Sequence, residues 1–207
     1  MHVHTRHSYD AHTRPEELVV HAAKRGLDGV AITDHNTVDG LSEFRRAGDL
    51  LIVPGVEVAT SQGHVLAINV SQTFKAGQSF AETVDQIHDA GGLAILAHPT
   101  AFLKGVPEKE INGTFDAIEV VNSSAVPFSY SVRKNQRIAA KLSLPQTGGS
   151  DAHRACEVGM AYSVVEADVG VEEVVKAIKK GAVTPFGRSI PWGMRLRREF
   201  LSLKKRV

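Results

Sequence analysis

The chain has 207 residues, of which 43% are hydrophobic and 23% charged, so it can bury one good-sized core, and its composition excludes a disordered chain. The 24 Lys and Arg residues nearly balance 23 Asp and Glu residues, which excludes a strong overall field for a polyanionic partner, although residues from Arg188 onward carry a local charge of +6. The single cysteine, Cys156, excludes an intramolecular disulfide, and no apolar run approaches the roughly 18 residues that span a bilayer. We therefore expect a soluble, cytoplasmic protein without membrane insertion, whose oligomeric state the sequence does not decide.

Short runs rich in Val and Ile alternate with segments of helical period along the chain. This is the pattern of repeated β–α units around a mostly parallel sheet. Ser79 and Glu82 form a capping-box pattern at the start of one helix. We expect helices over residues 15–26, 79–91, 130–143 and 171–180, strands over 30–33, 51–58, 64–70, 94–97, 117–121 and 161–165, and a further short strand leading into Gly149.

Histidines and carboxylates recur at the ends of the expected strands. In a barrel, the carboxyl ends of parallel strands meet at one face, so side chains from distant parts of the chain can share one cleft there. At the start of the chain, His2 and His4 form a His-x-His pair, and alternate side chains of an extended segment point the same way. The residues that end or follow the strands are Asp34, His35, Glu57, His98, Asp151 and His153.

This set of imidazole and carboxylate side chains indicates a metal centre. Such ligands suit zinc, manganese and ferrous iron, and a bridging carboxylate lets two cations lie about 3.5–4 Å apart. Glu57 is the natural bridge. Clustered cations activate a bound water and neutralise the oxygens of a phosphate ester, and phosphoryl transfer asks the protein mainly for positioning and electrostatics. The pattern therefore favours a metal-dependent phosphoesterase.

The order of these motifs resembles that of the polymerase and histidinol phosphatase (PHP) superfamily of metal-dependent phosphoesterases. The resemblance spans nearly the whole chain to about residue 187, and several motifs in one order are far more specific than any single motif. The matching segments are His-Val-His-Thr-Arg-His-Ser-Tyr-Asp at 2–10, Ala-Ile-Thr-Asp-His-Asn at 31–36, Gly-Val-Glu-Val at 55–58, Gly-His at 63–64, Ala-His-Pro at 97–99 and Gly-Ser-Asp-Ala-His at 149–153.

The resemblance implies an α/β fold, a distorted (β/α)7 TIM-like barrel with a metal cluster at the C-terminal strand ends. We expect the barrel domain to comprise residues 1–187 and residues 188–207 to form a basic tail, a helix packed on the outside of the barrel. An apolar stripe of Leu196, Phe200 and Leu203 would face the barrel. Relatives usually carry a few apolar residues before His-x-His, whereas only Met1 stands here, so either the first strand is short or the chain is truncated.

The resemblance also implies two to three divalent cations, which would be zinc, manganese or iron, with magnesium as a further option. The nucleophile would be a metal-bridging hydroxide. Asp10 stands where relatives carry either aspartate or histidine. The implied ligands are His2, His4, Glu57 and Asp151 for a first site, Glu57, His64 and His98 for a second, and Asp10, His35 and His153 for a third.

Catalysis is expected from Glu57, His35 and Asp151, together with Arg154, which directly follows the last metal motif and would bind the substrate phosphate. Two nearby acids have open roles. Asp34 is expected to orient a ligand histidine or to fix the turn at its strand end. Glu119 is either an additional ligand or a residue that supports one.

Three functions remain open at this level. The leading hypothesis is hydrolysis of a small phosphomonoester. The first alternative is a nuclease or nucleotide phosphodiesterase that acts on short oligonucleotides, but the charge balance and the aromatic content of 6% show no stacking platform for single strands. The second alternative is a non-catalytic module that metals stabilise. We therefore expect a small phosphorylated substrate, with nucleic acid as the alternative partner.

Overall fold

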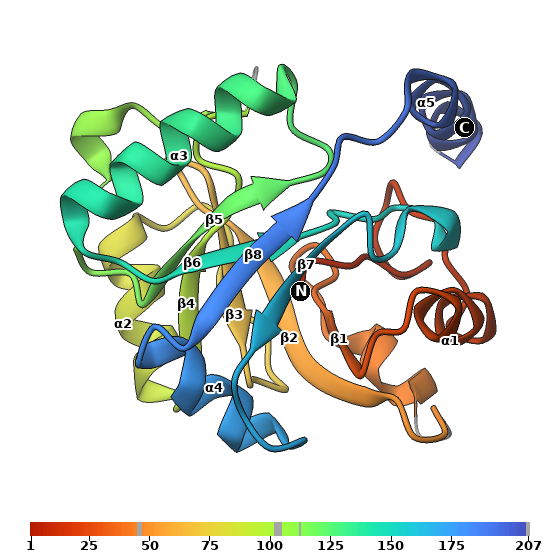
Figure 1. Ribbon diagram of the computed structural model, residues 1–207, viewed down its shortest axis with the longest axis horizontal. Helices are drawn as coiled ribbons and strands as arrows, with labels where there is room; N and C mark the ends of the chain where they lie inside the picture. Colours follow the sequence, from red (N-terminus) through yellow and green to blue (C-terminus); the bar gives the residue numbers. More distant parts are fainter. Residues whose placement is uncertain (45–46, 102–104, 112, 206–207) are drawn as a thin grey trace.

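The protein is an α/β structure built around one curled sheet (Figure 1). The computed structural model describes residues 1–44, 47–101, 105–111 and 113–205, and the side chains of residues 1–198 within these ranges. Six strands follow one another in the order β1-β2-β3-β4-β5-β6, and β7 and β8 form a separate two-stranded sheet beside β6. The strands are β1 (Gly29–Ile32), β2 (Leu51–Ala59), β3 (His64–Ile68), β4 (Leu93–Leu96), β5 (Ala117–Asn122), β6 (Gln146–Gly149), β7 (Ala161–Val165) and β8 (Val183–Gly187).

The helices lie around the sheet (Figure 1). They are α1 (Pro15–Lys24), α2 (Phe80–Asp89), α3 (Phe128–Leu142), α4 (Val171–Lys179) and α5 (Trp192–Lys205), with short 3-10 turns at Asp39–Phe44, Glu108–Glu110 and Ala155–Glu157. The expected capping box is confirmed, because the Ser79 side chain accepts from the Glu82 backbone N–H and the Glu82 carboxylate accepts from the Ser79 backbone N–H. Among the described residues, no helix is both long and apolar enough to cross a membrane.

The apolar core divides into parts that each lie under particular helices. Ile87 of α2 and Ile138 of α3 belong to one buried cluster, and Ile178 of α4 belongs to a second. Leu18 of α1 packs in a third cluster with Ile32 at the end of β1. Burial of these faces holds the strand ends, and the polar residues that follow them, in fixed positions.

The sheet is less parallel than the sequence pattern indicates. β3 runs antiparallel to both β2 and β4, whereas β1–β2, β4–β5 and β5–β6 are parallel pairs. The reason is the connection: residues 60–63 form a tight turn, and a parallel crossover needs about a dozen residues or more. As a consequence, His64 at the start of β3 pairs with Ala59 at the carboxyl end of β2. The α/β class is confirmed, while the count of seven β–α units stays a prediction.

β8 is a strand that the sequence pattern did not indicate. It pairs antiparallel with β7, and Pro185 lies in its middle. Proline lacks the backbone N–H of a ladder and is confined to sheet edges, so a strand signal interrupted by proline is weak. Ser163 of β7 links this sheet to the larger one, because its hydroxyl accepts from Gly148 N–H at 2.9 Å. Residues of β1 and β7 line a groove of about 750 Å³.

The expected apolar packing of the tail helix is wrong for Leu196. This side chain is 69% exposed, whereas Arg195 next to it is only 7% exposed. The helix therefore buries the charged side chain of Arg195 against the body of the protein. This is possible because backbone carbonyls accept hydrogen bonds from its guanidinium. The side chains of Phe200 and Leu203 lie outside the described residues. The domain boundary at residue 187 stays a prediction.

Residues 2–4 form a very short first strand between β1 and the segment after β6. Val3 makes parallel bridges to Ile32 on one side and to Ala152 on the other. His4 N–H donates to Ala152 O at 2.9 Å, and Thr33 N–H donates to Val3 O at 2.9 Å. Two or three residues paired on both edges are therefore enough to hold His2 and His4, which are both fully buried.

Gly149 provides a test of this packing. A Cβ at this position would contact Glu119 Oε1 and would lie 2.5 Å from the Cβ of His2, both buried groups. We expect Gly149→Ala to lower the free energy of unfolding by about 1–3 kcal/mol, the usual cost of overpacking. Chemical denaturation measures this change. Gly193→Ala in α5, whose Cβ would meet no heavy atom within 4 Å, is the control and should not lower this free energy. Equal stability of the two variants would contradict the close packing at β6.

Candidate metal centre

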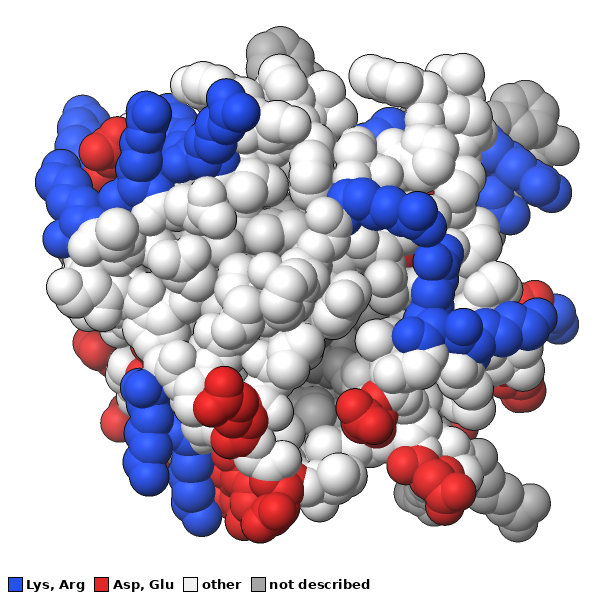
Figure 2. Space-filling model, viewed as in Figure 1, with Lys and Arg blue, Asp and Glu red and all other residues white. Residues whose placement is uncertain are grey.

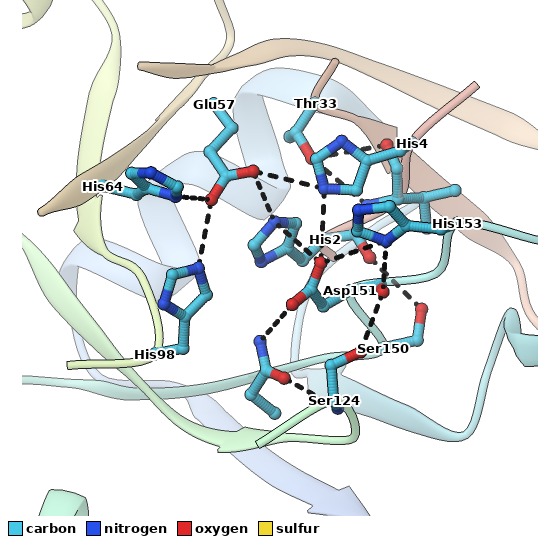
Figure 3. Close-up of polar contacts among 12 residues, drawn as sticks. His2, His4, Thr33, Glu57, His64, His98, Ser124, Ser150, Asp151 and His153 are labelled. Carbon is cyan, nitrogen blue, oxygen red and sulfur yellow. Dashed lines mark hydrogen bonds and ion pairs between the residues drawn. The ribbon is translucent and has the colours of Figure 1, made fainter. Parts of the chain in front are cut away.

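The nine side chains predicted as ligands converge on one cluster, most of which is visible in Figure 3. They come from distant parts of the chain, and each is placed by the end of a strand or by a loop next to one. Glu57 lies in β2, His64 begins β3, and His98 follows β4. The others are His2, His4 and Asp10 from the N-terminal segment, His35 after β1, and Asp151 and His153 after β6.

Glu57 lies at the centre of the cluster, with 1% of its surface exposed. Its Oε2 atom lies 3.1 Å from His2 Nε2, 3.2 Å from His4 Nε2 and 3.0 Å from His35 Nδ1. Its Oε1 atom lies 2.7 Å from His64 Nδ1 and 3.1 Å from His98 Nε2 (Figure 3). The two oxygens thus contact different histidines, which is the arrangement expected of a carboxylate shared between two sites.

Two aspartates complete the cluster. Asp151 Oδ1 lies 3.6 Å from His2 Nε2 and 3.3 Å from His4 Nε2. Asp10 Oδ1 lies 3.6 Å from His35 Nε2, and Asp10 Oδ2 lies 3.3 Å from His153 Nε2. The first and third predicted ligand sets are therefore each gathered in space, as the second set is around Glu57 Oε1.

The donor atoms fit a group of divalent cations. Several of them are buried and make ion-pair contacts but no hydrogen bond of good geometry among the described residues, namely the Nε2 atoms of His2, His4 and His35 and the Oε2 atom of Glu57. Burying such atoms unsatisfied is costly, and a cation would satisfy them. Two ligands about 2.1 Å from a tetrahedral ion stand about 3.4 Å apart, which is close to the distances found here.

Some donor atoms that lie close together belong to different predicted metal sites. Donor atoms of His2, His4 and Asp151 lie within 4.8 Å of one another, and so do those of His2, Glu57 and His98. Two other groups cross the predicted division, His35 with Glu57 and His64, and His4 with His35 and His153. The cluster is therefore continuous, and its division into individual sites stays a prediction.

The charges of the cluster shift its pKa values strongly in the metal-free protein. Burial acts to raise the pKa of the Glu57 carboxyl, but His2 and His35 outweigh burial and hold that pKa well below its usual range. Burial acts to lower the pKa of His35, but the carboxylates of Glu57 and Asp10 outweigh it and raise the pKa to about 10. For His4, burial and then the nearby His153 lower the pKa. The cluster thus holds protonated and neutral imidazoles side by side.

Glu119 and Asp34 support ligand residues. Glu119 Oε1 contacts His2 Nδ1 at 3.1 Å, the ring nitrogen that faces away from Glu57, and Glu119 Oε2 accepts from His98 N–H at 3.0 Å. Asp34 accepts from the Thr5 backbone N–H at 2.6 Å and from the Ser8 hydroxyl at 2.7 Å. Such contacts fix the orientation of a metal-binding imidazole.

Several residues of the site were not foreseen from the sequence. Asn122 donates to Glu119 Oε2 at 2.8 Å and lies 3.4 Å from Asp151 Oδ2. Asn122 ends the buried strand β5, so a search for polar residues at the carboxyl ends of strands could have found it. Ser8, 3.1 Å from His4 Nδ1, and Ser124 lie in loops and carry no such signal. Arg154 directly precedes the 3-10 turn Ala155–Glu157, and its binding to phosphate stays a prediction.

The fold and this cluster define a class of protein, α/β proteins with a histidine- and carboxylate-rich metal centre at the strand ends. The family model described as "PHP domain" matches residues 1–98, and the one described as "PHP-associated" matches residues 130–183. An uncharacterised protein of Methanocaldococcus jannaschii is 30% identical over 137 residues, which cover 59% of this chain and 80% of the relative. The chain belongs to the PHP superfamily.

Solved structures of similar fold include three informative cases. PsfC from Pseudomonas syringae has a TM-score of 0.76 at 16% identity and covers 99% of this chain and 96% of its own. A two-domain protein from Bacteroides vulgatus is described as containing a predicted PHP-like metal-dependent phosphoesterase. It has a TM-score of 0.70 at 17% identity, and the match covers 97% of this chain and 68% of the Bacteroides chain. The lesion-specific endonuclease PfuEndoQ from Pyrococcus furiosus has a TM-score of 0.66 at 18% identity, and the match covers 89% of this chain and 56% of the endonuclease chain. At these identities the likeness concerns the fold.

The raised pKa of His35 leads to a prediction about metal uptake. With a pKa of about 10, His35 is protonated at pH 8 in the metal-free protein, and an imidazole must lose that proton to bind a cation. We expect binding of Mn²⁺ at pH 8 to release about one proton more in the wild type than in His35→Gln. Isothermal titration calorimetry in buffers of different ionisation enthalpy measures this number. His21→Gln, on α1, is the control, and release that is the same in all three proteins would count against the assignment.

Proposed function

We propose that this protein is a metal-dependent phosphoesterase that hydrolyses small phosphomonoesters. The observation that carries the proposal is the position of Glu57, whose two oxygens contact two different sets of histidines at 2.7–3.2 Å. A carboxylate in this position can bridge two cations, and paired cations are the means by which many enzymes cleave phosphate esters. Membership of the PHP superfamily supports the same chemistry.

In this proposal, the side chains of the cluster hold two to three divalent cations. When bound, these cations would activate a water molecule at neutral pH and neutralise the phosphate oxygens. Glu57 is shared between two sites, Asp151 joins it on the side of His2 and His4, and Asp10 and His153 hold the outer side with His35. Arg154, beyond the last ligand motif, binds the substrate phosphate.

The position of His35 suggests where a substrate approaches. The ring of Tyr9, which is 55% exposed, stacks on the imidazole of His35 with centroids 5.0 Å apart. His35 is therefore near the surface side of the cluster, whereas His2 and His4 are fully buried. A phosphate that enters from solvent on this side meets the outer ligands first, in keeping with a catalytic role for His35.

The shared carboxylate can be tested by Glu57→Gln. The amide keeps the shape of the side chain but removes the negative charge that holds two cations together. We expect phosphatase turnover to fall by about 100-fold or more, the scale of losing one electrostatic group of an active site. Elemental analysis should show fewer metal equivalents per chain, and circular dichroism should show an unchanged fold. Glu172→Gln on the exposed face of α4 is the control. Near wild-type turnover in Glu57→Gln would refute the shared ligand.

One observation favours the alternative of a nuclease. Basic residues line the outer face of α3, together with exposed Tyr130, and they gather over this helix in the upper left of Figure 2. Lys134 lies 6.0 Å above the Tyr130 ring. Cations beside an exposed aromatic ring are a pattern found in nucleic-acid-binding surfaces. A similar fold, endonuclease Q, has been solved in complex with a 27-mer duplex containing an abasic lesion.

A substrate panel separates these functions. We expect kcat/KM for small phosphomonoesters to exceed that for short oligonucleotides by at least about tenfold, measured with Mn²⁺, Zn²⁺, Fe²⁺ and Mg²⁺, because the overall charge balance offers a polymer no strong field. The double variant Arg133→Gln/Arg137→Gln on α3 should leave this preference unchanged, as should the control Lys176→Gln/Lys180→Gln at the C-terminal end of α4.

Two other outcomes would replace the proposal. Efficient cleavage of oligonucleotides that weakens and loses its salt dependence only in the α3 variant would establish the nuclease function, since each phosphate contact releases counterions. Full metal occupancy without hydrolysis of any ester in the panel would favour the non-catalytic module that metals stabilise.

A further inference from the structure

Helix α5 contacts the loop that follows β5 through a buried arginine. The guanidinium of Arg195 donates to Ser123 O and Ser124 O, each at 2.8 Å, and its Nε donates to Ile190 O at 2.9 Å. A fourth contact, at 3.0 Å, is to the Ser189 hydroxyl. An arginine that is 7% exposed and bound to three backbone carbonyls fixes the helix against this loop.

A second arginine one turn later reaches the segment that carries two predicted ligands. Arg198 Nη1 donates to Ser124 Oγ at 2.9 Å, and that hydroxyl donates to the backbone carbonyl of Asp151 at 3.1 Å. The same carbonyl lies 3.0 Å from His153 Nδ1 (Figure 3). The Asp151 carbonyl thus connects α5 to the imidazole of His153.

Arg198 also approaches the same segment by a second route. Its Nη1 lies 3.8 Å from Oε2 of Glu157, which is fully buried. Glu157 Oε2 accepts from the backbone N–H of His153 at 2.9 Å. A buried carboxylate needs a nearby positive charge, and Arg198 supplies one. Arg198 therefore reaches the ring of His153 through Ser124 and the Asp151 carbonyl, and the backbone of His153 through Glu157.

The geometry of this segment requires such support. Asp151 has a φ of +49°, in the left-handed region that residues other than glycine rarely adopt. The contact of His153 Nδ1 with a carbonyl places the proton on that nitrogen and leaves Nε2 facing Asp10 at 3.3 Å. If the Asp151 carbonyl moved, the imidazole could rotate and the wrong nitrogen could face the cluster.

We propose that Arg198 is a positioning residue of the metal centre, which acts through Ser124 and Glu157 to hold Asp151 and His153 in their ligand geometry. The inference rests on the metal-dependent function proposed above, and it makes α5 part of the active centre instead of a peripheral tail. It assigns different roles to the two arginines: Arg195 anchors the helix, and Arg198 orients ligands.

The proposal predicts a selective loss of metal affinity. We expect Arg198→Gln to weaken Mn²⁺ binding by about 10- to 100-fold at one class of site, the usual effect of removing a residue that supports a ligand, and to change the remaining sites by less than about twofold. Calorimetric titration of the metal-free protein of 207 residues measures both classes. Arg198→Lys, which keeps a donor and a charge, should restore part of the affinity.

Arg197→Gln is the matched control, because Arg197 is an exposed neighbour on the same helix and the substitution removes the same charge. It should bind Mn²⁺ as the wild type does. Ser124→Ala should reproduce part of the loss, and the double variant Ser124→Ala/Arg198→Gln should lose less than the sum of the two, since both residues act along one chain of hydrogen bonds.

The outcomes are distinguishable. Unchanged Mn²⁺ binding in Arg198→Gln, or an equal loss at every site together with a lower melting temperature, overturns the positioning role and leaves only a structural anchor. Wild-type protein that binds none of Mn²⁺, Zn²⁺, Fe²⁺ and Mg²⁺ overturns this role and the proposed function together. Selective loss in Arg198→Gln, combined with a wild type that hydrolyses no phosphomonoester, supports the positioning role and refutes only the proposed function.

Discussion

A carboxylate buried among imidazoles governs the design of this protein. Glu57 is almost inaccessible to solvent, and five histidine nitrogens lie within 3.2 Å of its two oxygens. Ionisable groups at this density are stable only if charge is balanced locally, by protons on some imidazoles or by cations. The cluster therefore links folding, protonation and metal binding, and each strand that ends there must place its side chain accurately.

The sheet meets this requirement by an irregular arrangement. The reversal of β3 places His64 at the start of a strand, yet on the same edge as residues that follow the ends of parallel strands. Two residues of the cluster, His98 with a φ of +30° and Asp151 with a φ of +49°, have backbone conformations that are unfavourable for side-chain-bearing residues. Surrounding hydrogen bonds stabilise them, which is the usual situation at functional sites.

Residues outside the cluster determine how its members are oriented. Glu119 contacts one ring nitrogen of His2, and Asp34 holds the hydroxyl of Ser8, which in turn contacts His4. Helix α5 adds the contact of Arg198 with Ser124, whose hydroxyl donates to the Asp151 carbonyl. Support thus reaches the cluster from several directions, and part of it comes from the last helix of the chain.

The sequence by itself indicated most of the helices and strands and the nine side chains that the fold brings together in one cluster. Apolar periodicity and caps such as Ser79 are local signals, and histidines at strand ends are visible once the strands are recognised. Local signals did not reveal β8, where Pro185 interrupts the pattern, nor the exposure of Leu196. Only the tertiary structure decided which oxygen of Glu57 meets which histidine and that Arg198 supports His153, because these contacts join residues far apart in the chain and depend on how the packed elements align.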